Sequence, residues 1–287
     1  MVLSTPVPLP ASYLPAICSL TAVCVWGTSD FLGGLGSRRV NAFLFTAVVH
    51  VGGMAFAIAL AVASGAAFPA GTSLRWALAA GTVGGLAIAI FYRGLAEGKM
   101  GLVAPLAAVL SAAVPTAVSA FAEGFPGWRH LVGFVVAGIG VWLISRTEPA
   151  GRRPEGLGLA VLAGCGFAAF YLCVHKAGDA SALWIAACSR FASLVVTLVV
   201  VVLGRHLRGV PRSVAMVAIV TGILDISGTI VFVRAAQIGR LDAAVVLSSL
   251  YPAVTVVLAR IFLHEHLSRA RTVGMLAALI AVPMIAG

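Results

Sequence analysis

Hydrophobic residues fill the chain in ten long runs, and polar positions gather in the short loops between them. Hardly any run carries the polar face that a helix at the surface of a soluble domain shows. Apolar runs of about 18 residues or more are typical of membrane helices, because about 20 residues span the hydrocarbon layer of a bilayer. The pattern predicts ten spans, at 12–36, 40–64, 74–97, 100–122, 128–145, 156–177, 181–204, 213–238, 241–263 and 269–286.

Composition strengthens this interpretation. Of the 287 residues, 61% are hydrophobic and 10% are charged, against roughly 25% charged residues in an ordinary soluble domain. The sequence therefore predicts an all-α polytopic membrane protein with the lipid bilayer as its surroundings. The net charge of +10 does not indicate binding to nucleic acid, because the basic residues lie mainly in short loops with few aromatic residues among them.

Loop charges predict an orientation in the membrane. Of the 19 Lys and Arg residues, thirteen fall on the face opposite the N-terminus and five on the N-terminal face. Loops rich in Lys and Arg stay in the cytoplasm, so we expect both termini outside the cell. The five on the N-terminal face are Arg75, Arg129, Lys176, Arg234 and Arg240.

The two halves of the chain are related to each other. The loop from Arg146 to Glu155, "RTEPAGRRPE", separates them, and we place the boundary so that the halves are 1–148 and 149–287. At one fixed offset along the chain, rarer residues coincide: Phe91 with Phe232, Arg93 with Arg234, Gly98 with Gly239, and Gly133 with Gly274. Five spans per half would insert the second half upside down. Inverted repeats are a recurrent architecture of secondary transporters, with the substrate path near the midplane.

Short motifs resemble the EamA-type proteins of the drug/metabolite transporter superfamily. "VWGTSDF", around Trp26, is similar to their Trp-Gly-Ser/Thr motif, and "SRF", from Ser189, is similar to their Arg-Phe. In the last two spans, Pro252, Glu265 and Gly274 stand at the places of their Pro, Glu and Gly. The resemblance implies a ten-helix inner-membrane exporter or carrier of small metabolites. The first half departs from the pattern: its usual Gly-Glu-Arg reads Ala122, Glu123, Gly124, and His50 lies about where an Arg is expected.

Four ionisable residues lie inside predicted spans, namely Asp30, His50, Arg190 and Asp225. Each costs roughly 2.5–3.5 kcal/mol on insertion, so each is a functional candidate. Arg190 and Asp225 lie on consecutive spans at depths that differ by roughly 6 Å, and we expect them to pair. The pair is either a structural ion pair that fixes helix register, or a site that responds to protons or to a substrate carboxylate. On the second hypothesis, Asp225 takes up and releases a proton as Arg190 moves.

Asp30 and His50 form a looser counterpart in the first half, at depths that again differ by a few residues. His titrates near neutral pH, but a hydrogen-bonded packing role fits His50 equally well, and Asp30 could be solvated at the cytoplasmic interface. Trp26 either lines a cavity or only packs. Three further residues would line the cavity if their helices turn that way: Tyr92, Ser248 and Tyr251.

The sequence contains no motif of a cofactor, metal or enzyme site. "GLAEGKM" is one spacer short of a P-loop, and HExxH and GxSxG are missing. The leading prediction is a secondary transporter that exports a small-molecule substrate, amphipathic or amino-acid-like. Alternatives are a nucleotide-sugar or lipid-linked sugar transporter, which predicts a wider and more basic cavity, and a non-transporting scaffold or sensor. Assembly as a homodimer is left open.

Overall fold

The computed structural model describes residues 14–98, 100–123, 127–145, 156–238, 250–264 and 269–286, together with Ala244 and Ser248. The described residues form helices joined by turns, without a strand among them, so the all-α prediction is confirmed. The helices are α1 (Leu14–Ser37), α2 (Ala42–Ala63), α3 (Gly71–Glu97), α4 (Met100–Glu123), α5 (Trp128–Ser145), α6 (Leu157–Lys176), α7 (Ala182–Leu203), α8 (Arg212–Ile238), α10 (Tyr251–Phe262) and α11 (Arg269–Ala286).

Most predicted spans correspond to one helix each, and the ends agree closely. The span 241–263 is the exception: α10 covers its second part, Ala244 and Ser248 are helical, and its other positions up to 249 lie outside the described residues. The predicted boundary loop, 146–155, also lies outside them. Five helices are long and apolar enough to cross a membrane, namely α2, α3, α6, α7 and α8, and shorter apolar helices accompany them. The protein is therefore a membrane protein.

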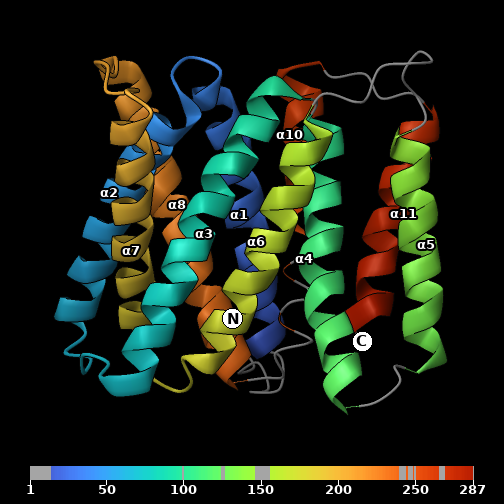
Figure 1. Cartoon of the computed structure of the whole chain (residues 1–287), viewed down its shortest axis with the longest axis horizontal. Coiled ribbons are helices and arrows are strands. Elements are labelled where there is room, and N and C mark those ends of the chain that lie inside the picture. The colour runs from blue at the N-terminus through green and yellow to red at the C-terminus, as the bar shows by residue number, and fades with distance from the viewer. Residues whose placement is uncertain are drawn as a thin grey trace, which may run out of the picture.

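The helices stand side by side in a broad slab (Figure 1). α2 and α7 form one end of the slab, α5 and α11 pack together at the other end, and α1, α3, α6 and α8 lie between them. Several packed pairs connect helices that are distant in the chain, among them α1 with α8, α3 with both α6 and α7, and α2 with both α7 and α8. The two halves of the chain thus interleave at the centre of the slab.

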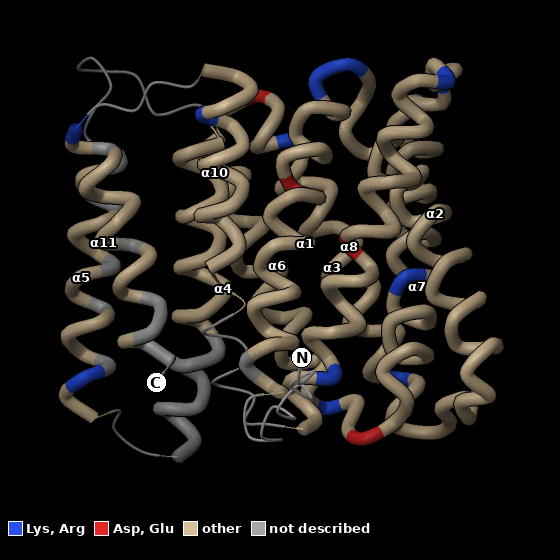
Figure 2. Tube along the Cα trace, turned by 180° about the vertical axis from the view of Figure 1, so that it is seen from behind, with Lys and Arg blue, Asp and Glu red and all other residues tan. Residues whose placement is uncertain are grey.

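Side chains are distributed as in a protein surrounded by lipid. On α7, one face exposes Val195, Val199 and Val202, while the opposite face buries Arg190 and Ser193. This reverses the pattern of a soluble helix, because the surrounding acyl chains accept apolar groups and reject polar ones. Charged residues lie mostly at the two ends of the helices, with few in their middle (Figure 2).

Two glycines bring pairs of helices into backbone contact. A Cβ added to Gly81 of α3 would collide with the backbone carbonyl of Ser189 in α7. A Cβ added to Gly222 of α8 would collide in the same way with the carbonyl of Val49 in α2. Small residues at such crossings let helix backbones approach closely in membranes. These crossings hold α7 and α2 close enough for their polar side chains to reach the centre.

Candidate functional site

A cavity of about 60 Å³ lies between α1, α3, α6, α7, α8 and α10. This is room for roughly four to six water molecules. Helices from both halves of the chain form its wall, as expected for a substrate path between two halves. Its polar lining residues are Asp30, Ser189, Arg190, Ser193, Asp225 and Thr229, and its aromatic lining residues are Trp26, Phe167, Phe170, Tyr171 and Tyr251.

Helical spacing explains why the lining residues face the same space. Trp26 and Asp30 are four residues apart on α1, and Asp225 and Thr229 are four residues apart on α8. Residues at this spacing lie one above the other on one helix face. Each helix therefore presents one short polar or aromatic stripe to the cavity, although its sequence is apolar on nearly every other face.

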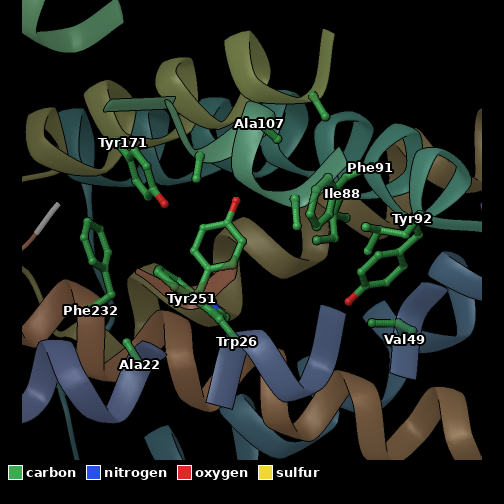
Figure 3. Packing of buried hydrophobic residues seen from close by; sticks show 14 of the residues in the cluster. Ala22, Trp26, Val49, Ile88, Phe91, Tyr92, Ala107, Tyr171, Phe232 and Tyr251 are labelled. Carbon is green, nitrogen blue, oxygen red and sulfur yellow. The ribbon is translucent and has the colours of Figure 1, made fainter. Parts of the chain in front are cut away.

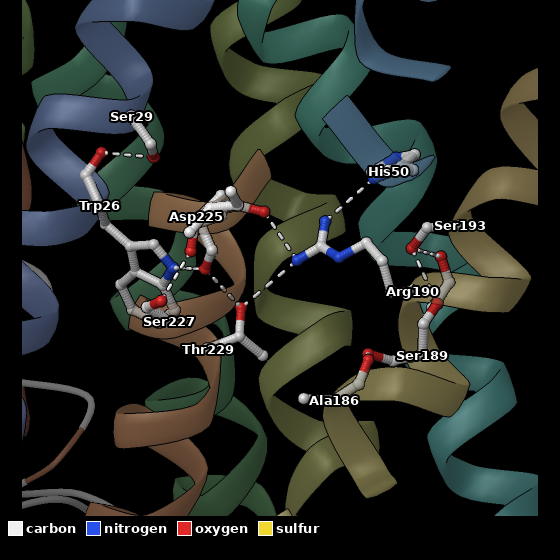
Figure 4. Close-up of polar contacts among 12 residues, drawn as sticks. Trp26, Ser29, His50, Ala186, Ser189, Arg190, Ser193, Asp225, Ser227 and Thr229 are labelled. Atoms are coloured by element: carbon white, nitrogen blue, oxygen red, sulfur yellow. Dashed lines mark hydrogen bonds and ion pairs between the residues drawn. The ribbon is translucent and has the colours of Figure 1, made fainter. Parts of the chain in front are cut away.

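Arg190 and Asp225 form a buried ion pair, as the sequence predicts. Arg190 Nη2 lies 2.6 Å from Asp225 Oδ2, and both side chains are more than nine-tenths buried. The same Nη2 donates a long bond of 3.5 Å to Thr229 Oγ1, whose hydroxyl donates in turn to the main-chain oxygen of Asp225 at 3.1 Å. Figure 4 shows the guanidinium between these groups.

His50 completes the cluster from α2, the first half of the chain. Its Nδ1 lies 3.0 Å from Arg190 Nη1. A guanidinium has donors only, so Nδ1 must accept the bond and the ring must carry its proton on Nε2. Nε2 has no hydrogen-bond partner in the part of the chain that the structure describes. The predicted pair of His50 with Asp30 is thus replaced by a contact with Arg190, because α2 packs against α7 and α8.

Trp26 connects α1 to the backbone of the ion pair. Its Nε1 donates a hydrogen bond of 3.1 Å to the main-chain oxygen of Asp225. The indole packs where Gly228 of α8 leaves space, since a Cβ there would meet the ring. Trp26 also lines the cavity, so the structure combines both roles that the sequence leaves open. Arg190, Asp225, His50 and Trp26 are called the central cluster below.

Replacing Trp26 with Phe removes this hydrogen bond and keeps an aromatic ring. We expect the free energy of unfolding to fall by about 1 kcal/mol, the usual net contribution of one buried hydrogen bond. Unfolding of purified protein with sodium dodecyl sulfate measures the loss. Trp128→Phe is the control, because Trp128 is 79% exposed and the same chemical change there leaves stability unaltered. An equal loss in both variants would contradict the role of the Nε1 bond.

Asp30 is buried, with 4% of its surface exposed, and lines the cavity. The alternative of a solvated Asp30 is wrong, because its side chain is buried. The described residues offer its carboxylate neither a hydrogen bond nor an ion pair. Asp30 is therefore the carboxylate of the cavity that is not neutralised by Arg190.

The remaining candidates divide between cavity and core. Tyr251 lines the cavity and packs edge-on against Trp26, with ring centroids 6.4 Å apart. Tyr92 and Ser248 are buried outside the cavity lining. Tyr92 packs against Phe45 and over Gly33 of α1, whose missing side chain makes room for the ring. Figure 3 shows Tyr92 beside Val49, apart from the group of Tyr171, Phe232 and Tyr251.

Among the lining residues that were not predicted, Thr229 and Tyr171 each have a signal in the sequence. Thr229 lies four residues after Asp225, on the same helix face. Tyr171 follows Asp30 at the same offset that separates Phe232 from Phe91. Its ring packs against Phe232 with centroids 5.1 Å apart. In an apolar sequence, two signals therefore point to further lining residues: the position four residues from a candidate on the same helix, and the position at the fixed offset from a candidate.

Groups of His, Cys, Asp and Glu that could hold a metal ion are missing among the described residues. The described Cys residues are free thiols on helices. The chemical groups that the described residues bring together here are one guanidinium, one imidazole, two carboxylates and several aromatic rings.

Comparison with known proteins finds a family and a solved structure to which the chain is similar. A solved structure described as "Crystal structure of protein" has the same fold, with a TM-score of 0.70 and 18% sequence identity, over 94% of this chain and 97% of that one. None of the curated proteins searched matches the chain. Residues 155–287 match the model of the EamA-like transporter family. The second half of the chain is therefore similar to the EamA-like transporters.

Proposed function

We propose that the protein is a secondary transporter that exports a small, amphipathic or amino-acid-like solute across the inner membrane in exchange for protons. The family suggests a membrane transporter. The observation that carries the proposal is the buried cluster of Arg190, Asp225 and His50 next to a cavity. Ionisable groups at this depth are costly and mark substrate and proton paths in membrane proteins.

The proposed architecture is two inverted repeats of five spans, 1–148 and 149–287. Helix packing supports it, because a packed pair of helices has an equivalent pair in which the two halves are swapped. The pair of α1 and α8 corresponds to α6 and α3, and the pair of α2 and α8 corresponds to α7 and α3. Gly81 and Gly222 are themselves related by the offset of the repeat and make equivalent backbone crossings. Two related units of opposite orientation can exchange conformations, which is the basis of alternating access.

In this mechanism, protonation of Asp225 removes the ion pair with Arg190. Charge pairs are strong in a low-dielectric interior, so losing one weakens the contact between α7 and α8. Protonation of His50 on Nδ1 is likewise incompatible with its contact to Arg190, because both atoms would then be donors. Since His50 comes from the first half and Arg190 from the second, proton uptake changes the contacts between the halves.

We propose that the basic end of the slab faces the cytoplasm, with both termini outside. At that end, the loops α1–α2 and α7–α8 lie together, and a surface pocket is lined by Arg38, Arg39, His206 and Arg208. Loops enriched in Arg stay on the cytoplasmic side. The exposed valines of α7 would contact acyl chains of the bilayer.

The sugar-transport alternative receives less support. It predicts a wide and basic cavity, whereas the lining contains Arg190 as its basic residue beside two carboxylates, in a volume of about 60 Å³. A nucleotide sugar carries two phosphates, which the carboxylates of Asp30 and Asp225 would repel. The cavity fits a small solute of few heavy atoms.

Reconstitution into liposomes tests the proposal. Vesicles containing a pH-sensitive dye are given amino acids and small amines one at a time, and release of protons in response to each solute is recorded. We expect a solute-dependent proton flux with the unchanged protein. The flux should fall at least about tenfold with Asp225→Asn, because an amide side chain cannot take up and release a proton as a carboxylate does. Asp179→Asn, at an exposed loop position, is the matched control and should retain the flux.

Unchanged proton flux in Asp225→Asn would remove Asp225 from the proton path. Solute movement without any proton flux would refute exchange for protons, and the protein would then be a uniporter. If none of the solutes moves and none raises thermal stability, a non-transporting scaffold becomes the better interpretation.

A further inference from the structure

Asp30 is the charged group of the cavity that the proton mechanism does not use. Its side chain is buried, with an exposed fraction of 4%. It lines the cavity. The described part of the chain gives it no hydrogen-bond or ion-pair partner. An unpaired buried carboxylate is costly unless a ligand or a proton neutralises it.

Arg190 is not available to neutralise Asp30 in this conformation. Its Nη2 contacts Asp225 at 2.6 Å, and its Nη1 contacts His50 at 3.0 Å. If His50 is neutral and Asp30 is ionised, the charges of Arg190, Asp225 and Asp30 sum to one negative charge. Either a proton on Asp30 or one monovalent cation beside it would balance this charge.

Aromatic rings surround the same space. Trp26, Tyr171 and Tyr251 line the cavity together with Asp30. Ring faces attract ammonium and guanidinium groups, and most strongly where water is excluded. The hydroxyl of Tyr251 is buried and has no hydrogen-bond partner among the described residues. It offers an acceptor to a donor placed beside Asp30, as a primary ammonium group with its three N–H donors requires.

We propose that Asp30, with Tyr251 and the aromatic wall, is the binding subsite for the ammonium group of a small organic amine. Asp30 supplies the charge, the Tyr251 hydroxyl accepts one N–H bond, and the ring of Trp26 covers the alkyl part. The volume of about 60 Å³ limits the solute to a few heavy atoms. This assignment rests on the proposed transport function for its biological use, but binding itself is independent of transport.

A series of three-carbon compounds tests the ligand class. n-Propylamine, propionate, propionamide and alanine have similar size and differ in charge. Calorimetric titration of the full-length protein in detergent micelles measures the affinity of each. We expect n-propylamine to bind most tightly and alanine more weakly, because Arg190 stays paired with Asp225 and cannot receive a carboxylate. Propionate and propionamide should bind at least about tenfold more weakly than the amine, the loss expected for a missing charge-assisted hydrogen bond.

Substitutions then locate the subsite. Asp30→Asn should weaken n-propylamine binding at least about tenfold, and Tyr251→Phe should weaken it about fivefold, the usual effect of one neutral hydrogen bond. Asp30→Glu keeps the charge and should retain part of the affinity, which distinguishes loss of binding from loss of folding. Asp179→Asn makes the same chemical change at an exposed position and should bind like the unchanged protein.

Three results would overturn the assignment: no binding of n-propylamine, equal binding by Asp30→Asn, or tighter binding of propionate than of the amine. The last would place the ligand on Arg190. These outcomes are separable from failure of the transport proposal. If amine binding depends on Asp30 but no solute flux occurs in liposomes, the subsite is supported and the transport proposal is refuted. If proton-coupled flux occurs and is unaffected by Asp30→Asn, the transport proposal is supported and the subsite is refuted.

Discussion

Replacing Arg190 with Ala is expected to abolish transport and to lower the free energy of unfolding by about 3–5 kcal/mol, the usual cost of removing one partner of a buried ion pair. The carboxylate of Asp225 would remain in an apolar interior without its counter-charge at 2.6 Å. His50 Nδ1 would lose its donor at the same time. The loss would therefore extend from the contact of α7 with α8 to that of α7 with α2.

The measurement is unfolding in sodium dodecyl sulfate together with solute flux in liposomes. Arg93→Ala is the control, because Arg93 also pairs with a carboxylate, that of Glu97 at 2.7 Å, but both side chains are about half exposed. Exposed pairs at this helical spacing contribute little, so stability should change by less than about 0.5 kcal/mol. A similar small change in Arg190→Ala would show that the central ion pair contributes little to folding.

The double variant Arg190→Met with Asp225→Leu separates the two hypotheses for this pair. Apolar residues of similar volume often replace a buried ion pair at no cost to stability. We therefore expect the double variant to recover the stability that Arg190→Ala loses. If the pair only fixes helix register, transport recovers as well. If it carries protons, transport stays absent in a stable protein, and that result would support the proposed mechanism.

The ion pair could be predicted from the sequence because depth in the membrane is nearly a function of residue number. In a straight helix each residue adds about 1.5 Å, so the residue numbers of two charged residues on consecutive spans show whether they lie at similar depths in the membrane. Arg190 and Asp225 met this condition, and the structure joins them. The same property explains why the helix ends agree closely with the predicted spans.

Azimuth around the helix axis could not be predicted in the same way. A soluble helix shows its buried face by a stripe of apolar residues, whereas these helices are apolar on nearly all faces. The partner of His50 was therefore assigned to Asp30 by depth alone, and Arg190 was missed. Tyr92 is the second example: its depth suited the cavity, but its helix turns it toward Gly33. Glycines that receive a ring leave no periodic signal in the sequence.

Replacing Gly81 or Gly222 with Ala is expected to lower the free energy of unfolding by about 1–3 kcal/mol, the usual cost of overpacking a close contact. The added Cβ would meet the backbone carbonyl of Ser189 or of Val49, which cannot move aside as the end of a side chain can. Either helix pair, α3 with α7 or α8 with α2, would have to separate. Denaturation with sodium dodecyl sulfate, followed by circular dichroism of the helices, measures each loss.

Gly138→Ala and Gly158→Ala are the matched controls, because a Cβ at either position has no atom within 4 Å. In a helix, Ala is favoured over Gly by up to about 1 kcal/mol, so both controls should be neutral or more stable. A gain of stability in Gly81→Ala would show that the backbones at this crossing separate without cost.

The comparison between the two glycines also tests the inverted repeat. If Gly81 and Gly222 are equivalent positions of two related units, their losses should be similar, and both should also reduce transport, because the crossings position Arg190 and His50. The two crossings involve different helix pairs, so the losses should add in the double variant. A large loss of stability at one glycine and none at the other would show that the two positions are not energetically equivalent, although the sequence offset relates them. The two halves would then depend on different helix contacts.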